Sequence, residues 1–492
     1  MADTTQETQS SQHHLEDRVH EVERETVAQI EDHHIDIIPD SARQGKPRDQ
    51  FTLWFAENCN PVNFVLGGLA VVLGLNLFWA IVAIVVGTGI GSLLTAFHAG
   101  QGPRLGVPQM IQSRGQFGFW GTEFLLLASI VLDIGYMALG NVVGGQALNG
   151  VYHGVSQPVW IVLLSIPTLI LGIFGYRWIH NVQKLFTVLL GIVLIYAAVE
   201  AFTYSSGVTA ADRGYHLSSF PIFLVTVGIF FMNMLSWAVY VSDYSRYLPR
   251  NTSGTRLFGA IFSGNMIGTC LYAILGAYIT TLLPKDYGSV TALGTVAGTW
   301  VLVLLACTGA FSNVFPPYTA MLAATSLVSN NPTVMAADLR RRVRVIGLVI
   351  VIAIGTVVAL LSYQNFFNHI ENFLGVLLFL FVPWSAINLV DYYLIRHGDY
   401  DVPSFFKVNG RYGAFQWPAC ICYIIGLAIQ VPFIDQEAYT GPLVKHLGGA
   451  DLSWLIGFAG SAIIFYAQAK IRANRTAPVA SVGQVAEAGA AS

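Results

Sequence analysis

Twelve apolar segments, separated by short loops that hold most of the charged residues, constrain this chain more than any other feature. A helix needs about 20 apolar residues to cross the hydrocarbon core of a bilayer. Only 11% of the 492 residues are charged, whereas soluble domains contain about 25%. We therefore expect an all-α integral membrane protein with twelve transmembrane helices, at residues 52–75, 77–99, 119–148, 158–175, 180–204, 220–242, 256–282, 292–327, 343–361, 371–395, 412–434 and 452–470. The third and eighth segments exceed the required length, so those spans are expected to tilt or to extend beyond the bilayer.

The distribution of basic residues tests this count, because cytoplasmic loops of membrane proteins carry an excess of Lys and Arg. With the N-terminus in the cytoplasm, three of the 25 basic residues fall in outer loops: Arg213, Lys285 and Lys445. An error of one span would scramble this division. The sequence thus predicts a multi-pass protein of the plasma (inner) membrane with both termini in the cytoplasm.

The division into parts follows from the same pattern. Residues 1–50 form a polar tail without a cleavable signal peptide, and a short amphipathic helix is possible around Leu15–Ile30. Residues 51–396 hold ten spans and are expected to form the core. Residues 397–471 add two transmembrane helices, and residues 472–492 form a flexible tail. The five cysteines all lie in apolar segments, where we expect small buried side chains and not disulfides.

The first span, Thr52–Gly74, is interrupted near its start by Glu57, Asn58, Cys59, Asn60 and Pro61. Proline cannot donate a backbone hydrogen bond and obstructs the preceding turn. A charge and amides at membrane depth must face protein, water or a ligand, and irregular backbone is tolerated there where it lines a cavity. Transporters use such broken helices to bind substrates and ions. The alternative is a proline kink packed between helices.

The first ten spans divide into two sets of five, and an odd number per set means that the second set enters from the opposite side. Two five-helix units with opposite orientations in the membrane form an inverted repeat. Polar residues concentrate in spans one and six and in spans three and eight, which are repeat-related pairs. In span six they lie within residues 231–237. Sequence identity between the halves is not visible, so the repeat is inferred from topology and polarity.

Four stretches carry a resemblance to a known family. They are Ile35–Asn60, Gly102–Gly121 (GPRLGVPQMIQSRGQFGFWG), Ser242–Pro249 (SDYSRYLP) and Pro383–Val402 (PWSAINLVDYYLIRHGDYDV), of which the last is the most specific. Together they resemble the purine–cytosine permeases of the nucleobase–cation symporter family. The resemblance implies a leucine-transporter-like five-plus-five inverted repeat plus two extra helices. It also implies a substrate site between spans one, three, six and eight, the spans that the polar pattern selects.

A nucleobase is a flat plate with a hydrogen-bonding edge, so its site needs a stacking surface and directional amide or carboxyl partners. The resemblance aligns Tyr136 with the stacking aromatic of the family and Asn313 with its base-recognising amide. Gly140 occupies a position where relatives can carry an amide, and the neighbouring Asn141 points about 100° away on an ideal helix. The full set of expected substrate-binding residues is Glu57, Asn58, Asp133, Tyr136, Asn233, Met234, Trp237 and Asn313.

Coupling-ion residues are expected among Glu57, Asp133 and Thr308. Asp133 lies three residues before Tyr136, so both can share one helix face. It could bind a cation, take the coupling proton, accept from a base N–H, or be a buried acid paired to a helix end or hydroxyl. Thr308 matches a hydroxyl of the Na⁺ site in Na⁺-coupled relatives, but Cys307 replaces the other hydroxyl. Because Na⁺ prefers hard oxygen ligands, this favours H⁺.

We therefore expect a secondary transporter that imports a nucleobase by cation-coupled symport, with H⁺ favoured over Na⁺. It would need no cofactor or metal and no nucleic acid, and its oligomeric state is open. A symporter of another nitrogen heterocycle, such as allantoin, a hydantoin or a thiamine-like compound, is the first alternative. An integral-membrane enzyme is a second, but the chain has no HExxH motif, Cys–His cluster or nucleotide loop. Asp243, Arg246, Asp391 and Arg396 lie at helix ends, where gating or structural ion pairs are expected.

Overall fold

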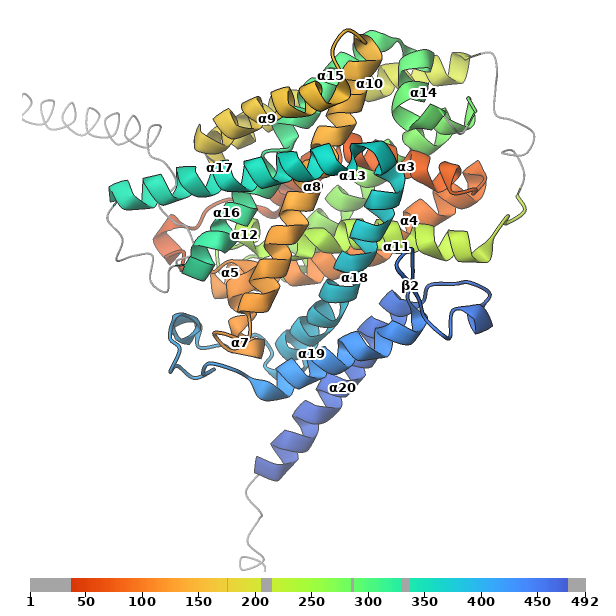
Figure 1. The fold of residues 1–492 in the computed structure, drawn as a ribbon. Coiled ribbons are helices and arrows are strands. Elements are labelled where there is room, and N and C mark those ends of the chain that lie inside the picture. The colour runs from red at the N-terminus through yellow and green to blue at the C-terminus, as the bar shows by residue number, and fades with distance from the viewer. Residues whose placement is uncertain (1–36, 175, 205–214, 285–286, 329–336, 477–492) are drawn as a thin grey trace, which may run out of the picture.

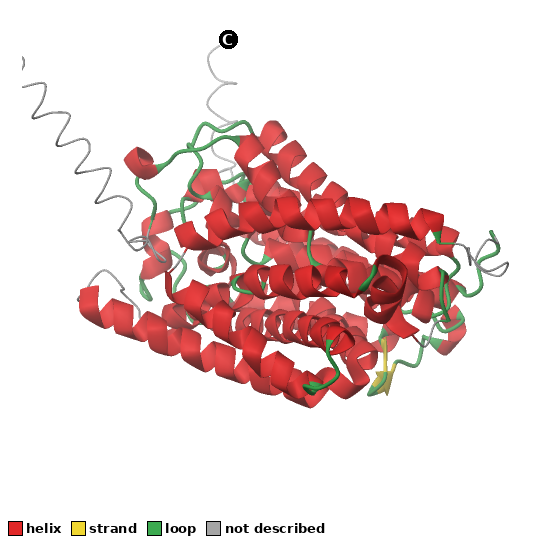
Figure 2. Cartoon of the chain, turned by 90° about the horizontal axis from the view of Figure 1, so that it is seen from above, coloured by secondary structure: helices red, strands yellow, loops and turns green. Residues whose placement is uncertain are grey.

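A computed structural model of the chain describes residues 37–174, 176–204, 215–284, 287–328 and 337–476, and these are mostly helical (Figure 2). The helix expected near Leu15–Ile30 and the tail from residue 477 onward lie outside the described residues. The described part of the N-terminal segment is not separate from the core. Its Gln44 N–H donates to the Tyr247 carbonyl at 2.7 Å, and Arg43 Nε donates to the carbonyl of Ile38.

The helices follow the predicted spans (Figure 1). Spans one to five are α2 (Pro47–Asn58) with α3 (Pro61–Val72), α4 (Leu77–Ala99), α8 (Glu123–Val151), α9 (Gln157–Phe174) and α10 (Tyr176–Thr203). Spans six to ten are α11 (Phe220–Ala238) with α12 (Val241–Ser245), α13 (Gly254–Thr281), α15 (Thr299–Ser312) with α16 (Phe315–Val328), α17 (Ala337–Ser362) and α18 (Phe366–Val390). The last two are α19 (Trp417–Gln430) and α20 (Ser453–Thr476).

Short elements connect the spans. They are the 3₁₀ turns η1 (Asp40–Ala42), η4 (Tyr363–Asn365), η6 (Val402–Phe406), η7 (Val431–Phe433) and η8 (Lys445–Leu447), the π-helical η5 (Asp391–Ile395), and the short helices α5 (Gln101–Leu105), α6 (Gln109–Gln112), α7 (Arg114–Phe117) and α14 (Gly288–Ala297). A hairpin pairs β1 (Asp435–Gln436) with β2 (Tyr439–Thr440) in antiparallel register.

Eight helices in the described chain are long and apolar enough to cross a bilayer. The remaining four spans correspond to shorter or broken helices, namely α2 with α3, α9, α10 and α19 with η7. The expectation that the eighth segment, 292–327, is one overlong span was wrong. Its first part belongs to α14, and the chain then turns at Gly298, whose φ of +90° favours glycine. The span itself runs over Thr299–Met321.

Spans that are five apart in sequence lie together in space. One group, the first group, contains α2, α3, α4, α11 and α13, which are spans one, two, six and seven. The second group contains α8, α9, α15, α16 and α17, which are spans three, four, eight and nine. Helices α19 and α20 pack against each other and α20 packs on α18, apart from both groups (Figure 1). This pairing is the one expected of two repeats of five spans with two helices added.

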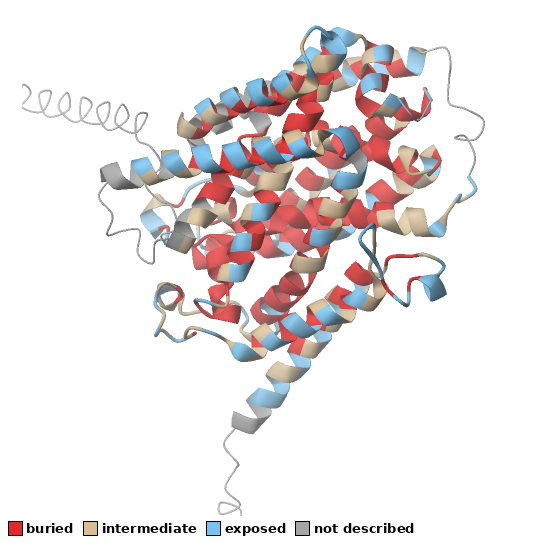
Figure 3. Ribbon diagram, in the orientation of Figure 1, coloured by how far each residue is buried: buried red, intermediate tan, exposed pale blue. Residues whose placement is uncertain are grey.

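Apolar side chains also cover the outside of the molecule, as a bilayer requires. On α10 they recur at three- and four-residue intervals, as Val188, Ile192, Ile195, Val199 and Phe202, all exposed. The helices on the periphery carry such exposed faces and the buried residues gather in the middle (Figure 3). Inside, helices α3 and α13 cross at glycines. A Cβ on Gly67 would lie 1.8 Å from the Ala273 carbonyl oxygen, so no larger residue fits that crossing.

Basic residues gather at one end of the molecule, which we call the arginine-rich end. It comprises residues 38–50, 100–118, 241–251 and 391–416. Arg104 Nη1 donates to the His397 carbonyl at 3.2 Å, and Arg114 Nη1 donates to the Phe405 carbonyl at 3.1 Å. At the opposite end Ser218 Oγ donates to the Gly74 carbonyl at 2.8 Å. Two of the loops that the charge pattern assigned to one side, 100–118 and 391–416, thus meet at one end.

Candidate substrate site

Three helices are broken near the centre of the molecule. The first break separates α2 from α3 at Cys59–Asn60, where Pro61 starts α3 and Asn60 caps it by accepting from the Asn63 N–H at 3.0 Å. The third separates α15 from α16 at Asn313–Val314, just before Pro316 and Pro317. The break of span six was expected within residues 231–237. The helix instead continues to Ala238 and breaks at Val239–Tyr240.

A cavity lies where these breaks meet α8. Its volume is about 60 Å³, below the roughly 300–1,000 Å³ that small-molecule sites occupy, so the site is narrow in this conformation. Its walls come from spans one, three, six and eight, the four that the sequence selected. The lining residues are Glu57, Asn60, Pro61, Val62, Tyr136, Gly140, Asn233, Ser236, Trp237, Tyr240, Gly309, Asn313, Phe315 and Pro316.

Amide side chains connect the two broken helices of the first group. Asn233 Nδ2 on α11 donates to Asn63 Oδ1 on α3 at 2.7 Å. Asn60 Nδ2 donates to the Glu57 carbonyl at 2.6 Å and so closes the break in span one. From the second group, the Tyr136 hydroxyl donates to Asn233 Oδ1 at 3.4 Å. An amide presents a donor and an acceptor together, which matches the edge of a nitrogen heterocycle.

Aromatic rings form much of the remaining wall. Trp237 packs edge-on against Trp54 and Tyr240, with ring centroids at 5.5 and 5.6 Å. Its indole N–H is buried and has no hydrogen-bond partner among the described residues. Tyr136 meets Phe373 edge-to-face at 5.8 Å. Planar ring faces beside the unpaired indole N–H of Trp237 suit a flat solute that carries a hydrogen-bond acceptor.

Asn313 is fixed by α8. Its Nδ2 donates to the Met137 carbonyl and to Asn141 Oδ1, both at 2.9 Å. A Cβ on Gly140 would lie 2.4 Å from Asn313 Oδ1, so the glycine makes room for the amide. Asn141 itself does not line the cavity, as its helical position predicted, and it orients Asn313 instead.

Four predicted substrate or ion residues lie outside the cavity, and three of them are held by bonds within or between helices. Asn58 is fully buried and bonded to α13, through Asn265 Oδ1 at 2.9 Å and the Thr269 hydroxyl at 3.0 Å. Met234 packs toward Thr269, whose hydroxyl lies 3.4 Å from its sulfur. Thr308 donates to the carbonyl of Leu304, at 2.7 Å.

Cys307 is exposed on the outer surface of α15. The thiol therefore does not lie beside Thr308 in an ion site. Its presence in the sequence is no longer a reason to prefer H⁺ over Na⁺ as the coupling ion. Asp133, predicted as a substrate or ion residue, lines a separate smaller cavity, which is described below. No group of three or more His, Cys, Asp or Glu residues that could hold a metal ion occurs in the described part of the chain.

Sequence reasoning missed several lining residues. Asn60 was seen only as part of the polar interruption, although an Asn-Pro pair is a good signal for a helix start that points into a site. Asn63 does not line the cavity but holds Asn233 in place. Tyr240 lies at a break that no Pro or Gly marks, with φ −141° and ψ 12°. Nothing in the local sequence identifies that position.

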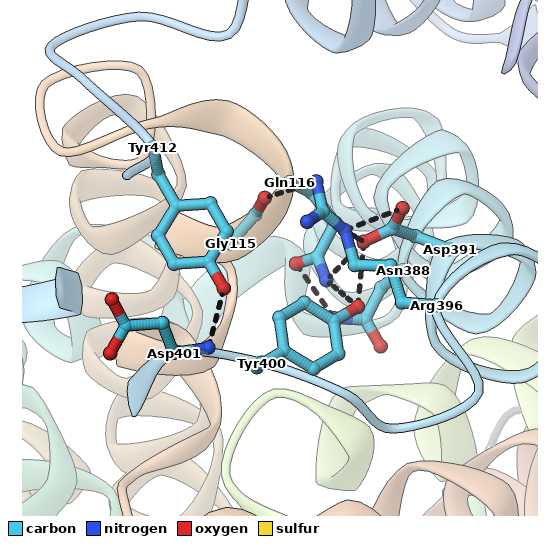
Figure 4. Close-up of polar contacts among 8 residues, drawn as sticks. All are labelled: Gly115, Gln116, Asn388, Asp391, Arg396, Tyr400, Asp401 and Tyr412. Atoms are coloured by element: carbon cyan, nitrogen blue, oxygen red, sulfur yellow. Dashed lines mark hydrogen bonds and ion pairs between the residues drawn. The ribbon is translucent and has the colours of Figure 1, made fainter. Parts of the chain in front are cut away.

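A second polar cluster lies at the arginine-rich end and consists of the most specific family stretch (Figure 4). Asp391 Oδ2 on η5 pairs with Arg396 Nε at 2.9 Å, as an ion pair expected from the sequence. The Tyr400 hydroxyl donates to the same oxygen at 2.6 Å, and Gln116 Nε2 on α7 donates to it at 3.1 Å. Burial raises the pKa of the Tyr400 hydroxyl well above its usual value, so it stays protonated and donates.

This cluster continues along α18 toward α4 of the first group of helices. Asn388 on α18 bonds to Gln116 Oε1 at 3.2 Å and accepts from Gln101 Nε2 at 2.6 Å. His98 on α4 stacks on Trp384 with ring centroids at 4.8 Å, and its Nε2 lies 2.9 Å from Ser385 Oγ. The signature stretch thus joins α18 to α4 and to the α4–α8 connection, and it does not line the cavity.

Comparisons with known proteins agree with this architecture. Residues 37–457 match the profile of a family described as permeases for cytosine/purines, uracil, thiamine and allantoin. A putative purine-cytosine permease of Bacillus subtilis is 34% identical over 452 residues, which cover 91% of this chain and 98% of the relative. A purine-cytosine permease of Emericella nidulans is 24% identical and covers 84% and 83% of the two chains.

The fold also matches a solved structure. Mhp1, a nucleobase-cation-symport-1 family transporter in a closed conformation with bromovinylhydantoin bound, superimposes with a TM-score of 0.73 at 17% identity. The match covers 91% of this chain and 96% of Mhp1. The relatives are permeases and not enzymes. The chain is therefore a multi-pass membrane transporter that belongs to the family of permeases for cytosine/purines, uracil, thiamine and allantoin.

Proposed function

We propose that the chain imports a nucleobase of the purine or cytosine type by proton-coupled symport, with the base held in the cavity between the broken helices. The observation that carries this proposal is the cavity wall, where the amides of Asn60, Asn233 and Asn313 surround a space bounded by Trp237 and Tyr136. The edge of a base needs such amides, and its faces need such rings. The names of the purine-cytosine permease relatives point to the same class of solute.

Glu57 is the acid in this cavity. It is 4% exposed and is the last residue but one of α2, directly before the break in span one. In this position it can accept from an amino or ring N–H of the base, or carry the coupled proton. Because Cys307 is exposed, the thiol no longer argues against Na⁺, and the preference for H⁺ rests on buried acids such as Glu57.

The arginine-rich end is proposed to face the cytoplasm, with the chain in the plasma (inner) membrane and both termini inside. This follows from the excess of basic residues at that end. Transport would then proceed by movement of the first group of helices against the second, which exposes the cavity to each side in turn.

The test is uptake in a host that lacks its own base transporters. Labelled adenine, hypoxanthine and cytosine are offered, and unlabelled allantoin and a hydantoin are added as competitors. We expect uptake of at least one base, collapse of uptake with a protonophore, and no effect of Na⁺ removal. Na⁺-dependent uptake would refute proton coupling, and competition by the hydantoin alone would refute the base assignment.

A hydantoin is the second candidate substrate. The observation in its favour is the fold match to Mhp1, which holds bromovinylhydantoin. The two solutes differ in their edges, because adenine and cytosine carry an exocyclic amino group besides their ring N–H, whereas a hydantoin offers Glu57 ring N–H donors alone. Replacing Glu57 with Gln therefore discriminates between them: it should weaken competition by adenine or cytosine more than competition by a hydantoin.

A further inference from the structure

A second, smaller cavity lies beside the substrate cavity, on the side of the arginine-rich end. Its walls come from α6, α8, α16 and the α11–α12 break. Tyr240 lines both cavities and separates them. The lining residues are Pro108, Met110, Ile111, Leu126, Ser129, Asp133, Val239, Tyr240, Asp243, Thr319 and Ala323.

Asp133 is the buried acid of this cavity. It is 1% exposed, and its Oδ1 accepts no hydrogen bond within the described chain. The hydroxyl of Ser129 donates to the Leu126 carbonyl at 2.8 Å. Thr319 lies against the carboxyl, but the backbone carbonyl of Pro316 competes for its single proton at 2.9 Å. The neighbouring hydroxyls therefore do not satisfy both carboxyl oxygens.

The groups that face Asp133 do not neutralise it. Tyr240 and Asp243, at the α11–α12 break, are the titratable ones, and Thr319 faces it from α16. Asp243 Oδ1 accepts from the Gln109 N–H at 2.8 Å. No Lys, Arg or His lines this cavity among the described residues. An acid in such a place is stabilised by a bound cation.

We propose that Asp133 is the proton-binding site of the transport cycle, separate from the substrate site and linked to it by Tyr240. The proposal rests on the proposed function. A proton fits better than Na⁺, because a proton needs only the one carboxyl oxygen of Asp133 that accepts no hydrogen bond. Na⁺ would need several of the oxygen-bearing side chains in this lining to turn toward one point, and Met110, Ile111, Leu126 and Val239 occupy much of the wall between them. The carboxylate gains an O–H bond with a proton from one side and loses that proton to water on the other.

Tyr240 supplies the link because its backbone forms the break. When α11 and α12 change their relative direction, a wall of each cavity moves with Tyr240. Base binding at Trp237 and Tyr136 then alters the space around Asp133. A site of this kind couples the binding of the proton to the binding of the base, although the two never touch.

The first test uses purified protein in liposomes with an imposed pH gradient. Asp133→Asn should abolish accumulation of the base against its gradient but retain exchange of external for internal base, since the substrate cavity is intact. Glu200→Gln is the matched control, because it removes an acid near the end of α10, outside both cavities; it should accumulate base like the wild type. Accumulation by Asp133→Asn at the wild-type level overturns the proposal.

Two further measurements keep the result decisive. Asp133→Glu, which keeps a carboxyl group, should shift the pH of half-maximal uptake, and an unchanged profile overturns the proposal. Infrared difference spectra between high and low pH, recorded without substrate, should show a carboxylic-acid C=O band that is missing in Asp133→Asn. A band that persists in Asp133→Asn overturns the proposal. If the band is lost in Asp133→Asn but the wild type transports none of the bases, the proton site stands and only the proposed substrate is refuted. Accumulation driven by a Na⁺ gradient and lost in Asp133→Asn would overturn the choice of proton.

Discussion

Replacement of Asn58 by Ala separates a structural role from a substrate role in the broken first span. The side chain of Asn58 lies in a fully buried position between α2 and α13. Its Nδ2 donates to the Trp54 carbonyl at 2.8 Å and to Asn265 Oδ1 at 2.9 Å, and its Oδ1 accepts from the Thr269 hydroxyl at 3.0 Å. Two of these bonds cross between helices, so the substitution removes the polar contacts that hold α2 against α13.

The magnitude follows from those bonds. A hydrogen bond between membrane helices contributes about 0.6 kcal/mol on average, but a buried partner left unsatisfied costs about 1–3 kcal/mol. Asn265 and Thr269 each lose a partner, although Thr269 keeps the Met234 sulfur at 3.4 Å. We therefore expect Asn58→Ala to reduce stability by about 2–4 kcal/mol.

The assay compares thermal unfolding in detergent with substrate affinity measured on the same preparation. Asn58→Ala should unfold several degrees earlier and bind the base with unchanged affinity. Tyr136→Leu is the contrasting variant: it removes a ring that lines the cavity, so affinity should fall. Its 3.4 Å hydroxyl bond and its edge-to-face contact with Phe373 together contribute about 1–3 kcal/mol of stability. Normal stability with weakened binding in Asn58→Ala would refute this reasoning and restore Asn58 to the substrate site.

Three further predictions concern the site and its surroundings. Asn313→Ala should abolish uptake at normal membrane abundance, checked by uptake and immunoblot; normal uptake would remove Asn313 from the site. Gly140→Ala should weaken substrate binding, because the added Cβ would lie 2.4 Å from Asn313 Oδ1, and overpacking of this kind costs about 1–3 kcal/mol; unchanged affinity would contradict it. Asp391→Asn should lower the melting temperature without altering substrate affinity, because breaking a buried pair such as that with Arg396 costs about 3–5 kcal/mol; weaker binding at unchanged stability would argue against a structural role.

The broken first span shows what a sequence can predict about such a site. Glu57 and Pro61 located the break, because a charge and a missing N–H at membrane depth are tolerated mainly where the backbone lines a cavity or packs inside the protein. Periodicity and the division of basic residues then gave the spans and their pairing. These signals are local or statistical, so they can be read from the sequence without knowing how the helices pack.

The direction in which each side chain points could not be predicted in the same way. Asn58 and Asn60 are two residues apart, yet one bonds α13 and the other lines the cavity. Thr308 and Cys307 were placed together in an ion site, but adjacent residues on a helix point about 100° apart, and Cys307 is exposed. Their roles depend on the rotation of each helix about its axis, which the packing of the other helices determines.

The bonds around the cavity suggest how a solute could drive the change between states. Within the first group, Asn233 bonds to Asn63 at 2.7 Å, and within the second, Asn313 bonds to Asn141 at 2.9 Å. The bond from Tyr136 to Asn233, which crosses from one group to the other, is longer at 3.4 Å. Each wall is thus assembled within its own group, and a flat solute between them would add contacts that bridge the groups. Because a ligand shifts an equilibrium only through contacts that differ between states, a base that reaches both walls favours the arrangement in which they lie closest.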